Sequence, residues 1–172
     1  MKYILPICLI IFLFFSKYSF AKATPASTIN SQIESYNQTV KTYSKSHQQS
    51  LTKLSKDITD LNQQKTSELE QNLQTQGEIL DEYVSRNNLS ENGGIDGIHR
   101  NSDSLSQARY WLTFAHEAVA YQAAKNYIFY LTSENNIKSD ANNLIGSFET
   151  DLNYVRNQVL KSQVTIKNLV SK

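Results

Sequence analysis

After Pro25 the chain contains no proline, and this feature limits most strongly what it can fold into. Proline ends or kinks helices, and glycine weakens them. Three of the five glycines lie in one stretch, residues 85–103, so long uninterrupted segments remain on both sides of it. No segment shows the alternation of apolar and polar residues that is typical of a β-strand. We therefore predict an all-α protein with one clear loop at 85–103.

The first predicted helix covers residues 28–84. Its apolar and aromatic residues recur at steps of four and three, skip across His47 and then resume, which indicates a heptad seam with one four-residue insertion. Beyond Leu61 the seam weakens, and Gly77 is a weak point because glycine costs a helix interior ~1 kcal/mol relative to alanine. The seam consists of Ile29, Ile33, Tyr36, Val40, Tyr43, Leu51, Leu54, Ile58 and Leu61.

Two further helices are predicted, over residues 104–134 and 139–170. The first of them opens with Ser104 and Gln107 at capping-box spacing. The second carries the most regular heptad pattern of the chain, in which Ser162 is the single polar member. Its seam is Ala141, Ile145, Phe148, Leu152, Val155, Val159, Ser162, Ile166 and Leu169.

The lengths of these helices predict an elongated three-helix bundle. At 1.5 Å per residue they would measure ~85, ~42 and ~48 Å, so half of the long N-terminal, coiled-coil-like helix has nothing to pack against. Either that helix folds back near Gly77, or its N-terminal half projects beyond the bundle. We favour projection, because no residue in 28–76 breaks a helix. A projecting apolar seam would need a partner.

Residues 108–131 hold the single tryptophan of the chain, four of its ten tyrosines and the pair His116–Glu117. Apolar residues fall on two sides of the predicted helix, which is typical of a helix buried between two neighbours. We therefore interpret this stretch as the aromatic-rich central helix of the bundle, with His116 a partly buried, hydrogen-bonded residue. As a membrane segment it is unfavourable, because the charged and polar residues in its middle would each be costly to insert.

No pattern of catalytic or metal-binding residues stands out. His116–Glu117 begins like the H-E-x-x-H zinc motif, but the fifth position is Ala120. The chain has no Gly-x-Ser-x-Gly elbow, and the acidic residues of the 85–103 loop miss the spacing of a calcium-binding EF-hand. We predict a protein that is not an enzyme and uses no cofactor or metal.

The N-terminus is typical of a secretory signal peptide. Lys2 precedes the apolar run 4–15, and Ala21-Lys22-Ala23 matches the small-x-small cleavage rule, so we predict residues 1–23 as the signal peptide and 24–172 as one helical domain. A retained anchor is the alternative, although the run is shorter than the ~20 residues that span a bilayer. The single cysteine, Cys8, lies inside this run.

Export places the mature chain in the periplasm or outside the cell. Removal of 1–23 takes away three of the seventeen basic residues and leaves fourteen against sixteen acidic ones, without a basic stripe. Nucleic acid is therefore not an expected partner.

These observations lead to an exported, non-enzymatic helical protein that acts by coiled-coil contact with a protein partner or with further copies of itself. In outline the chain resembles the exported minor-pilus or adaptor subunits of bacterial conjugation and type IV secretion systems, which share a signal peptide, a long Gln/Asn/Ser-rich first helix and a helical bundle. The resemblance implies a structural or adaptor role in a cell-envelope assembly. The residues predicted to contact partners are Ile33, Tyr36, Val40, Tyr43, Leu51, Leu54, Ile58, Leu61, Leu89, Ile95 and Ile98.

Two other function classes remain open. A secreted effector, adhesin or toxin-like bundle would act at a membrane or host surface. A periplasmic binding protein or chaperone for an apolar ligand would need a pocket among Trp111, Tyr121 and Tyr127.

Overall fold

The computed structural model describes residues 26–87, 89 and 99–171. Within these residues the chain forms α-helices and one short 3₁₀ turn and no strand, so the all-α prediction is confirmed. The predicted signal peptide, 1–23, and residues 90–98 of the predicted loop lie outside the described residues. The elements are α2 (Ala26–Lys41), α3 (Lys45–Arg86), α4 (His99–Ala123), η2 (Glu134–Asn136) and α5 (Ile137–Val170).

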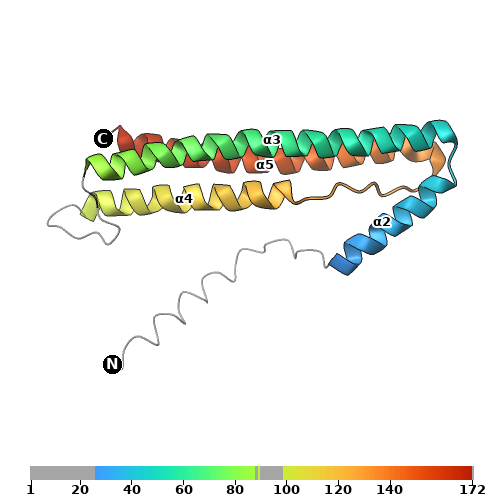
Figure 1. Ribbon diagram of the computed structural model, residues 1–172, viewed down its shortest axis with the longest axis horizontal. Helices are drawn as coiled ribbons and strands as arrows, with labels where there is room; N and C mark the ends of the chain where they lie inside the picture. The colour runs from blue at the N-terminus through green and yellow to red at the C-terminus, as the bar shows by residue number, and fades with distance from the viewer. Residues whose placement is uncertain (1–25, 88, 90–98, 172) are drawn as a thin grey trace, which may run out of the picture.

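The three longest helices, α3, α4 and α5, lie side by side, and each contacts the other two. Helices α3 and α5 run in the same direction, and α4 runs opposite to both (Figure 1). Their core has two apolar clusters along the bundle axis. One contains Leu73, Ala115, Val119, Val155 and Val159, and the other contains Leu80, Leu105, Ala108, Ile166 and Leu169.

The first predicted helix is in fact two helices, because the chain turns at residues 42–44. The backbone N–H groups of Thr42 and Tyr43 donate to the carbonyls of Thr39 and Val40, both at 3.0 Å. Tyr43 is 8% exposed and packs with Leu51 and Phe129. The turn lies close to the point where the heptad seam skips, so the discontinuity predicted as an insertion accompanies a reversal of the chain.

Both predicted courses for the N-terminal half are therefore wrong. Helix α2 turns back at the end of the bundle (Figure 1), where the Tyr36 ring stacks on Phe129 at a centroid distance of 5.9 Å. No reversal occurs at Gly77, which lies within the continuous helix α3. A Cβ at that position would meet Leu112 Cδ2 at 3.8 Å, an ordinary van der Waals contact.

The second predicted helix, α4, begins at His99 instead of residue 104 and ends at Ala123 instead of residue 134, so Ser104 and Gln107 lie inside it and the predicted loop 85–103 is shorter. Residues 125–133 form a connection that is not helical and leads to η2 (Figure 1). An extended chain advances ~3.3 Å per residue, against 1.5 Å in a helix, so this connection covers the remaining length of the bundle with few residues. Phe129 anchors it, with 4% of its surface exposed.

The C-terminal helix agrees with its predicted range to within two residues at its start. Its seam faces the other helices: Phe148, Val155, Val159, Ile166 and Leu169 are all buried. Asp140 in the first turn accepts hydrogen bonds from the backbone N–H of Thr132 at 2.9 Å and from its hydroxyl. This carboxylate therefore ties the connection to the start of α5.

Candidate functional site

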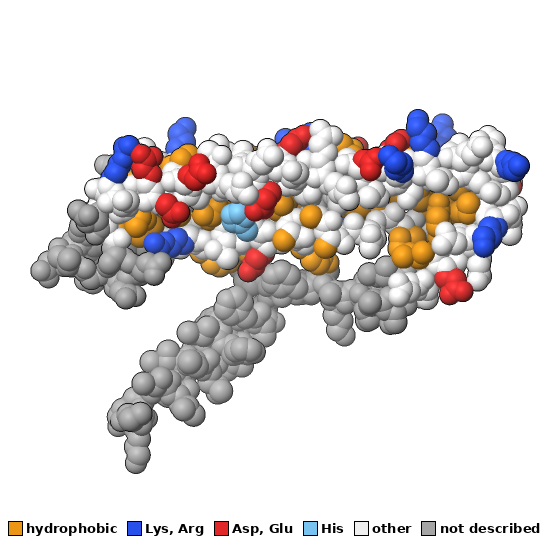
Figure 2. Space-filling view, viewed as in Figure 1, with side chains coloured by type: hydrophobic (Ala, Val, Ile, Leu, Met, Phe, Trp, Pro, Cys, Tyr) orange, Lys and Arg blue, Asp and Glu red, His pale blue; other side chains and the backbone are white. Residues whose placement is uncertain are grey.

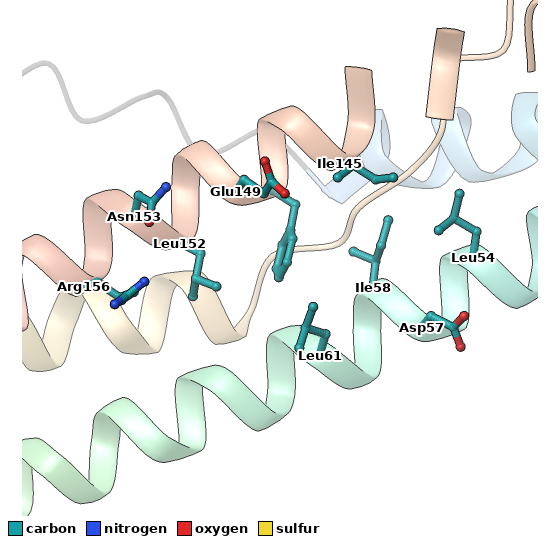
Figure 3. Close-up of a pocket in the computed structure, with 10 residues that line it drawn as sticks. Leu54, Asp57, Ile58, Leu61, Ile145, Glu149, Leu152, Asn153 and Arg156 are labelled. Atoms are coloured by element: carbon teal, nitrogen blue, oxygen red, sulfur yellow. The ribbon is translucent and has the colours of Figure 1, made fainter. Parts of the chain in front are cut away.

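An apolar groove of about 500 Å³ lies between α3 and α5 (Figure 3). Helix α3 contributes positions separated by four and three residues, and α5 contributes positions separated by three and four, so each helix presents one side of its heptad seam. The apolar lining consists of Leu54, Ile58 and Leu61 from α3 and Ile145, Phe148 and Leu152 from α5.

The groove has a buried floor and an open rim. Ile58 and Phe148 are each 4% exposed and form part of the core, whereas Leu61 is 40% exposed. Leu152 and Leu54 are half-buried. A ligand in the groove would therefore cover leucine side chains that already stand partly in water, which is favourable because apolar surface leaves water.

Three exposed charges border the groove: Asp57 on α3, and Glu149 and Arg156 on α5. Figure 3 places Asp57 and Arg156 toward opposite ends of the groove, with Glu149 between them. None of the three forms an ion pair with another residue in the part of the chain that the structure describes. The groove thus combines an apolar centre with a polar rim, an arrangement that is also found in protein interfaces.

Most of the seam predicted to contact partners is used within the molecule. Tyr43, Leu51 and Ile58 are buried, and Tyr36 and Val40 pack against the cluster around Phe129. The expectation that the N-terminal seam has no intramolecular partner is therefore wrong for these residues, because the turn at 42–44 brings Tyr36, Val40 and Tyr43 against Phe129 and Leu51.

The remaining predicted contact residues lie in different surroundings. Leu54 and Leu61 line the groove, and Ile33 is 38% exposed on α2. Leu89 packs against the cluster that contains Leu80 and Leu105. Ile95 and Ile98 lie outside the described residues.

Sequence reasoning missed the α5 side of the groove. Ile145 and Leu152 belong to the regular seam predicted for the C-terminal helix, and neither is among the residues predicted to contact partners. In the structure they face a groove, since α4 has ended and the 125–133 connection replaces it at this level. No local feature of the α5 sequence indicates this change of neighbour.

His116 lies between α4 and α3, and its Nδ1 is 2.9 Å from Glu70 Oε1. Both side chains are partly exposed, which confirms the interpretation of His116 as a partly buried, hydrogen-bonded residue. Glu117, its neighbour in sequence, is exposed and takes no part in this pair. Among the described residues no group of three or more histidine, cysteine, aspartate or glutamate side chains is placed to hold a metal ion.

A buried polar network marks the end of α4. Asn62 on α3 donates to the backbone carbonyl of Gln122 at 2.9 Å, and Gln122 Nε2 donates to Asn62 Oδ1 at 2.9 Å and to the Tyr127 hydroxyl at 2.7 Å. Tyr127 in turn donates to Asp151 Oδ2 at 3.0 Å, and Lys125 pairs with the same oxygen at 2.8 Å. Burial, together with the hydrogen bond to Asp151, raises the pKa of Tyr127.

The three aromatic residues considered for a ligand pocket have separate environments. Trp111 contacts Phe114 edge to face at 5.7 Å and carries Lys161 Nζ 3.5 Å from its ring centroid. Tyr121 is 50% exposed, with Lys125 Nζ at 5.2 Å from its ring, whereas the Tyr127 hydroxyl is taken up by the polar network. These contacts give no support to a shared pocket.

The described helices include none that is both long and apolar enough to cross a membrane. On the face shown in Figure 2, apolar side chains appear in separate groups among charged and uncharged polar ones.

Comparison with known proteins identified no relative: no family model, no curated protein and no solved structure matches the chain.

Proposed function

We propose that this protein is an exported, non-enzymatic helical protein that acts by coiled-coil-like contact with protein partners. In this proposal α3, α4 and α5 are an elongated three-helix bundle around the aromatic-rich helix α4, and the α3–α5 groove is the contact surface. The setting is the periplasm or the cell exterior, in a structural or adaptor role within a bacterial envelope assembly such as a conjugation or type IV secretion apparatus.

The observation that carries the proposal is the open apolar groove between two parallel helices. Such a groove accepts an amphipathic helix whose apolar residues recur at i, i+3, i+4 and i+7. Leu61 and Leu152 would contact that helix from the two sides, and the unpaired charges of the rim would meet its polar flanks. The contact would be of the coiled-coil type, at the groove, which includes Leu54, Ile58 and Leu61 of the predicted N-terminal seam.

The export half of the proposal rests on the sequence of residues 1–23, with its basic start, apolar run and Ala-x-Ala site. It is tested by fractionating cells that express the full chain and measuring the mass of the recovered protein. We expect a mature N-terminus at Thr24 in the exported fraction. Recovery of a chain that retains residues 1–23 within the cytoplasm would contradict export.

The contact half is tested by photo-crosslinking in living cells. A photoreactive amino acid replaces Leu61 or Leu152, and matched variants carry it at Gln71 on α3 or Asn168 on α5, which are exposed and do not line the groove. We expect discrete protein adducts from positions 61 and 152 and none from 71 and 168. Equal labelling at all four positions, or none at 61 and 152, would contradict contact through the groove.

A second candidate, action at a membrane or host surface, is favoured by exposed aromatic residues. Tyr110 and Tyr121 on α4 are each 50% exposed and Tyr154 on α5 is 54% exposed, with Lys125 and Lys161 stacked on neighbouring rings. Tyrosine and tryptophan favour the membrane–water interface, and lysine is attracted to anionic lipids. Flotation with anionic vesicles tests this candidate by measuring binding, and release of vesicle contents measures leakage. Binding or leakage that is lost in Tyr110→Ser/Tyr121→Ser would support this candidate over the first.

A further inference from the structure

We infer that the occupant of the α3–α5 groove is a second copy of this chain, docked antiparallel about a two-fold axis near Asn153. The inference rests on the proposed function, because it takes the groove as a contact surface, and it adds the identity of the partner and the geometry of the contact. In this arrangement α5 of each copy lies along the groove of the other.

The outward face of α5 carries a second regular series next to the groove. Its members are separated by three, four, three and four residues, the spacing of a heptad seam. All of them are exposed, so this face is available in the isolated chain. The series is Gly146, Glu149, Asn153, Arg156 and Leu160.

In a two-fold interface, residue i of one copy contacts residue j of the other, and j contacts i. The series must therefore match the same series running in the opposite direction, and it does. Glu149 precedes Asn153 by four residues and Arg156 follows it by three. Reversing the second helix about Asn153 therefore brings Arg156 of each copy beside Glu149 of the other. Both side chains lack an ion pair among the described residues, so the interface supplies the pairs that each copy lacks.

The shapes match in the same register. Gly146 precedes Asn153 by seven residues and Leu160 follows it by seven, so each leucine lies over the glycine of the other copy. No atom lies within 4 Å of a Cβ built on Gly146, and Leu160 is 51% exposed. A large apolar side chain thus meets open space beside a helix backbone, which allows the two α5 helices to approach closely.

Further apolar side chains extend the face beyond the groove. Val164 lies one turn after Leu160 and is 55% exposed. On α3, Ile79 is 43% exposed and lies eighteen residues, or five helical turns, after Leu61, so both lie on the same side of that helix. At the axis, Asn153 meets its own copy, and a buried asparagine in a seam sets the register of paired helices.

A charge exchange tests the pairing. Sedimentation of the protein recovered from cells expressing the full chain should show a dimer. Glu149→Arg and Arg156→Glu should each raise the dissociation constant of this dimer at least ~10-fold, because each places like charges together. The double variant should restore it to within ~3-fold of wild type, since the pairs are re-formed with opposite polarity. Glu78→Arg, an exposed reversal on α3 away from the groove, should leave it unchanged.

A cysteine at the axis tests the register. In a Cys8→Ser background, Asn153→Cys should form an intermolecular disulfide under mild oxidation, because the two copies of residue 153 face each other across the axis. Asn168→Cys, on an exposed position of α5 outside the series, should not. Circular dichroism verifies that both variants keep their helical content.

Two outcomes would overturn the inference. One is a monomer at all concentrations with no disulfide at 153, and the other is a dimer that the charge exchange does not affect. The mass of the groove adduct separates this inference from the proposed function. An adduct of twice the chain mass supports a second copy, whereas an adduct with a different protein, from a monomeric chain, removes the second copy and leaves the contact function standing.

Discussion

At the scale of single residues, the end of α4 is held by polar side chains and not by a helix-breaking residue. Gln122 is 1% exposed, its Nε2 donates to both Asn62 and Tyr127, and its backbone carbonyl accepts from Asn62. Side chains thus supply hydrogen-bond partners at the point where the chain leaves the helix. The hydroxyl of Tyr127 connects α4 to Asp151 on α5. One phenol thus links the side chains that surround the transition from helix to extended chain.

Tyr127→Phe should lower the free energy of unfolding by about 1–2 kcal/mol, because a partly buried carboxylate and a buried amide each lose a hydrogen-bonding partner. The measurement is urea unfolding followed by circular dichroism. Tyr130→Phe is the matched control: its side chain is 86% exposed and should tolerate the change within ~0.5 kcal/mol. Equal effects of the two substitutions would show that the hydroxyl of Tyr127 has no special role.

The turn between α2 and α3 is held by a carboxylate from a distant part of the sequence, the side chain of Glu134 in η2. Glu134 Oε1 accepts from the backbone N–H of Ser44 at 2.7 Å and lies 2.7 Å from His47 Nδ1. These contacts, the Ser44 backbone bond foremost, lower the pKa of Glu134 from 4.5 to about 2. The ionised carboxylate is therefore the form that holds the turn.

Because the pKa of Glu134 is lower in the folded state, its contribution to stability is complete above about pH 4.5 and is lost as the pH falls to about 2. Glu134→Gln should remove this component, so its unfolding temperature should depend less on pH across that window than that of the wild type. Thermal melts from pH 7 to pH 2 measure it. Glu78→Gln, an exposed change on α3, should keep the wild-type profile; if Glu134→Gln keeps it too, the carboxylate does not hold the turn.

At the scale of elements, the continuity of α3 and the position of the turn before it have different physical causes. Helix α3 continues through Gly77 because both neighbouring helices pack along it and Leu112 approaches the glycine. The chain instead reverses at 42–44, where the sequence has no proline or glycine. Long-range contacts of Tyr43 and Glu134 supply the free energy that the turn needs.

Gly77→Ala should raise the free energy of unfolding by up to ~1 kcal/mol, since alanine favours a helix interior and the added methyl fits beside Leu112. Chemical denaturation measures the change. Gly77→Val is the contrasting variant, because its branched side chain needs more room at the same contact and loses rotamer freedom in a helix. A loss of stability in the alanine variant would show that Leu112 cannot accommodate even one methyl group.

At the scale of the whole molecule, the helices have unequal lengths, and the chain compensates with a connection that is not helical. Helix α4 packs along one end of the long α3, while the 125–133 connection lies beside the other, where Tyr36 and Val40 of α2 pack against the cluster around Phe129. An extended segment fills less space than a helix beside α3 and α5, and the α3–α5 groove lies at this end of the bundle. The same groove then contains residues of the core and residues of the surface.

Because the groove contains both core and surface residues, we expect different outcomes for substitutions at Ile58 and at Leu61. Ile58→Asp should destabilise the fold by several kcal/mol, because it places an unpaired carboxylate where 4% of the side chain is exposed. Leu61→Asp, at 40% exposure, should change the unfolding free energy by less than ~1 kcal/mol and still abolish contact through the groove. Thermal melts and sedimentation of both variants measure the two effects; a large loss of stability in Leu61→Asp would assign that residue to the core.

The sequence by itself determined the helical class, the regular seam of α5 and three of the apolar groove residues, Leu54, Ile58 and Leu61. These features depend on local properties: the absence of helix breakers and the spacing of apolar residues along one helix. Helix propensity and periodicity depend on residues within a few turns of each other, so both can be predicted from the sequence alone.

Only the tertiary structure decided where the first predicted helix divides, where α4 ends and which side of each seam stays open. The Ser44–Glu134 hydrogen bond joins residues separated by 90 positions, and the Asn62–Gln122 pair joins residues separated by 60. The packing of Tyr43 with Phe129 is likewise long-range. Contacts of this kind override local helix propensity because burial and hydrogen bonding at a single turn outweigh the few tenths of a kcal/mol per residue that propensity contributes.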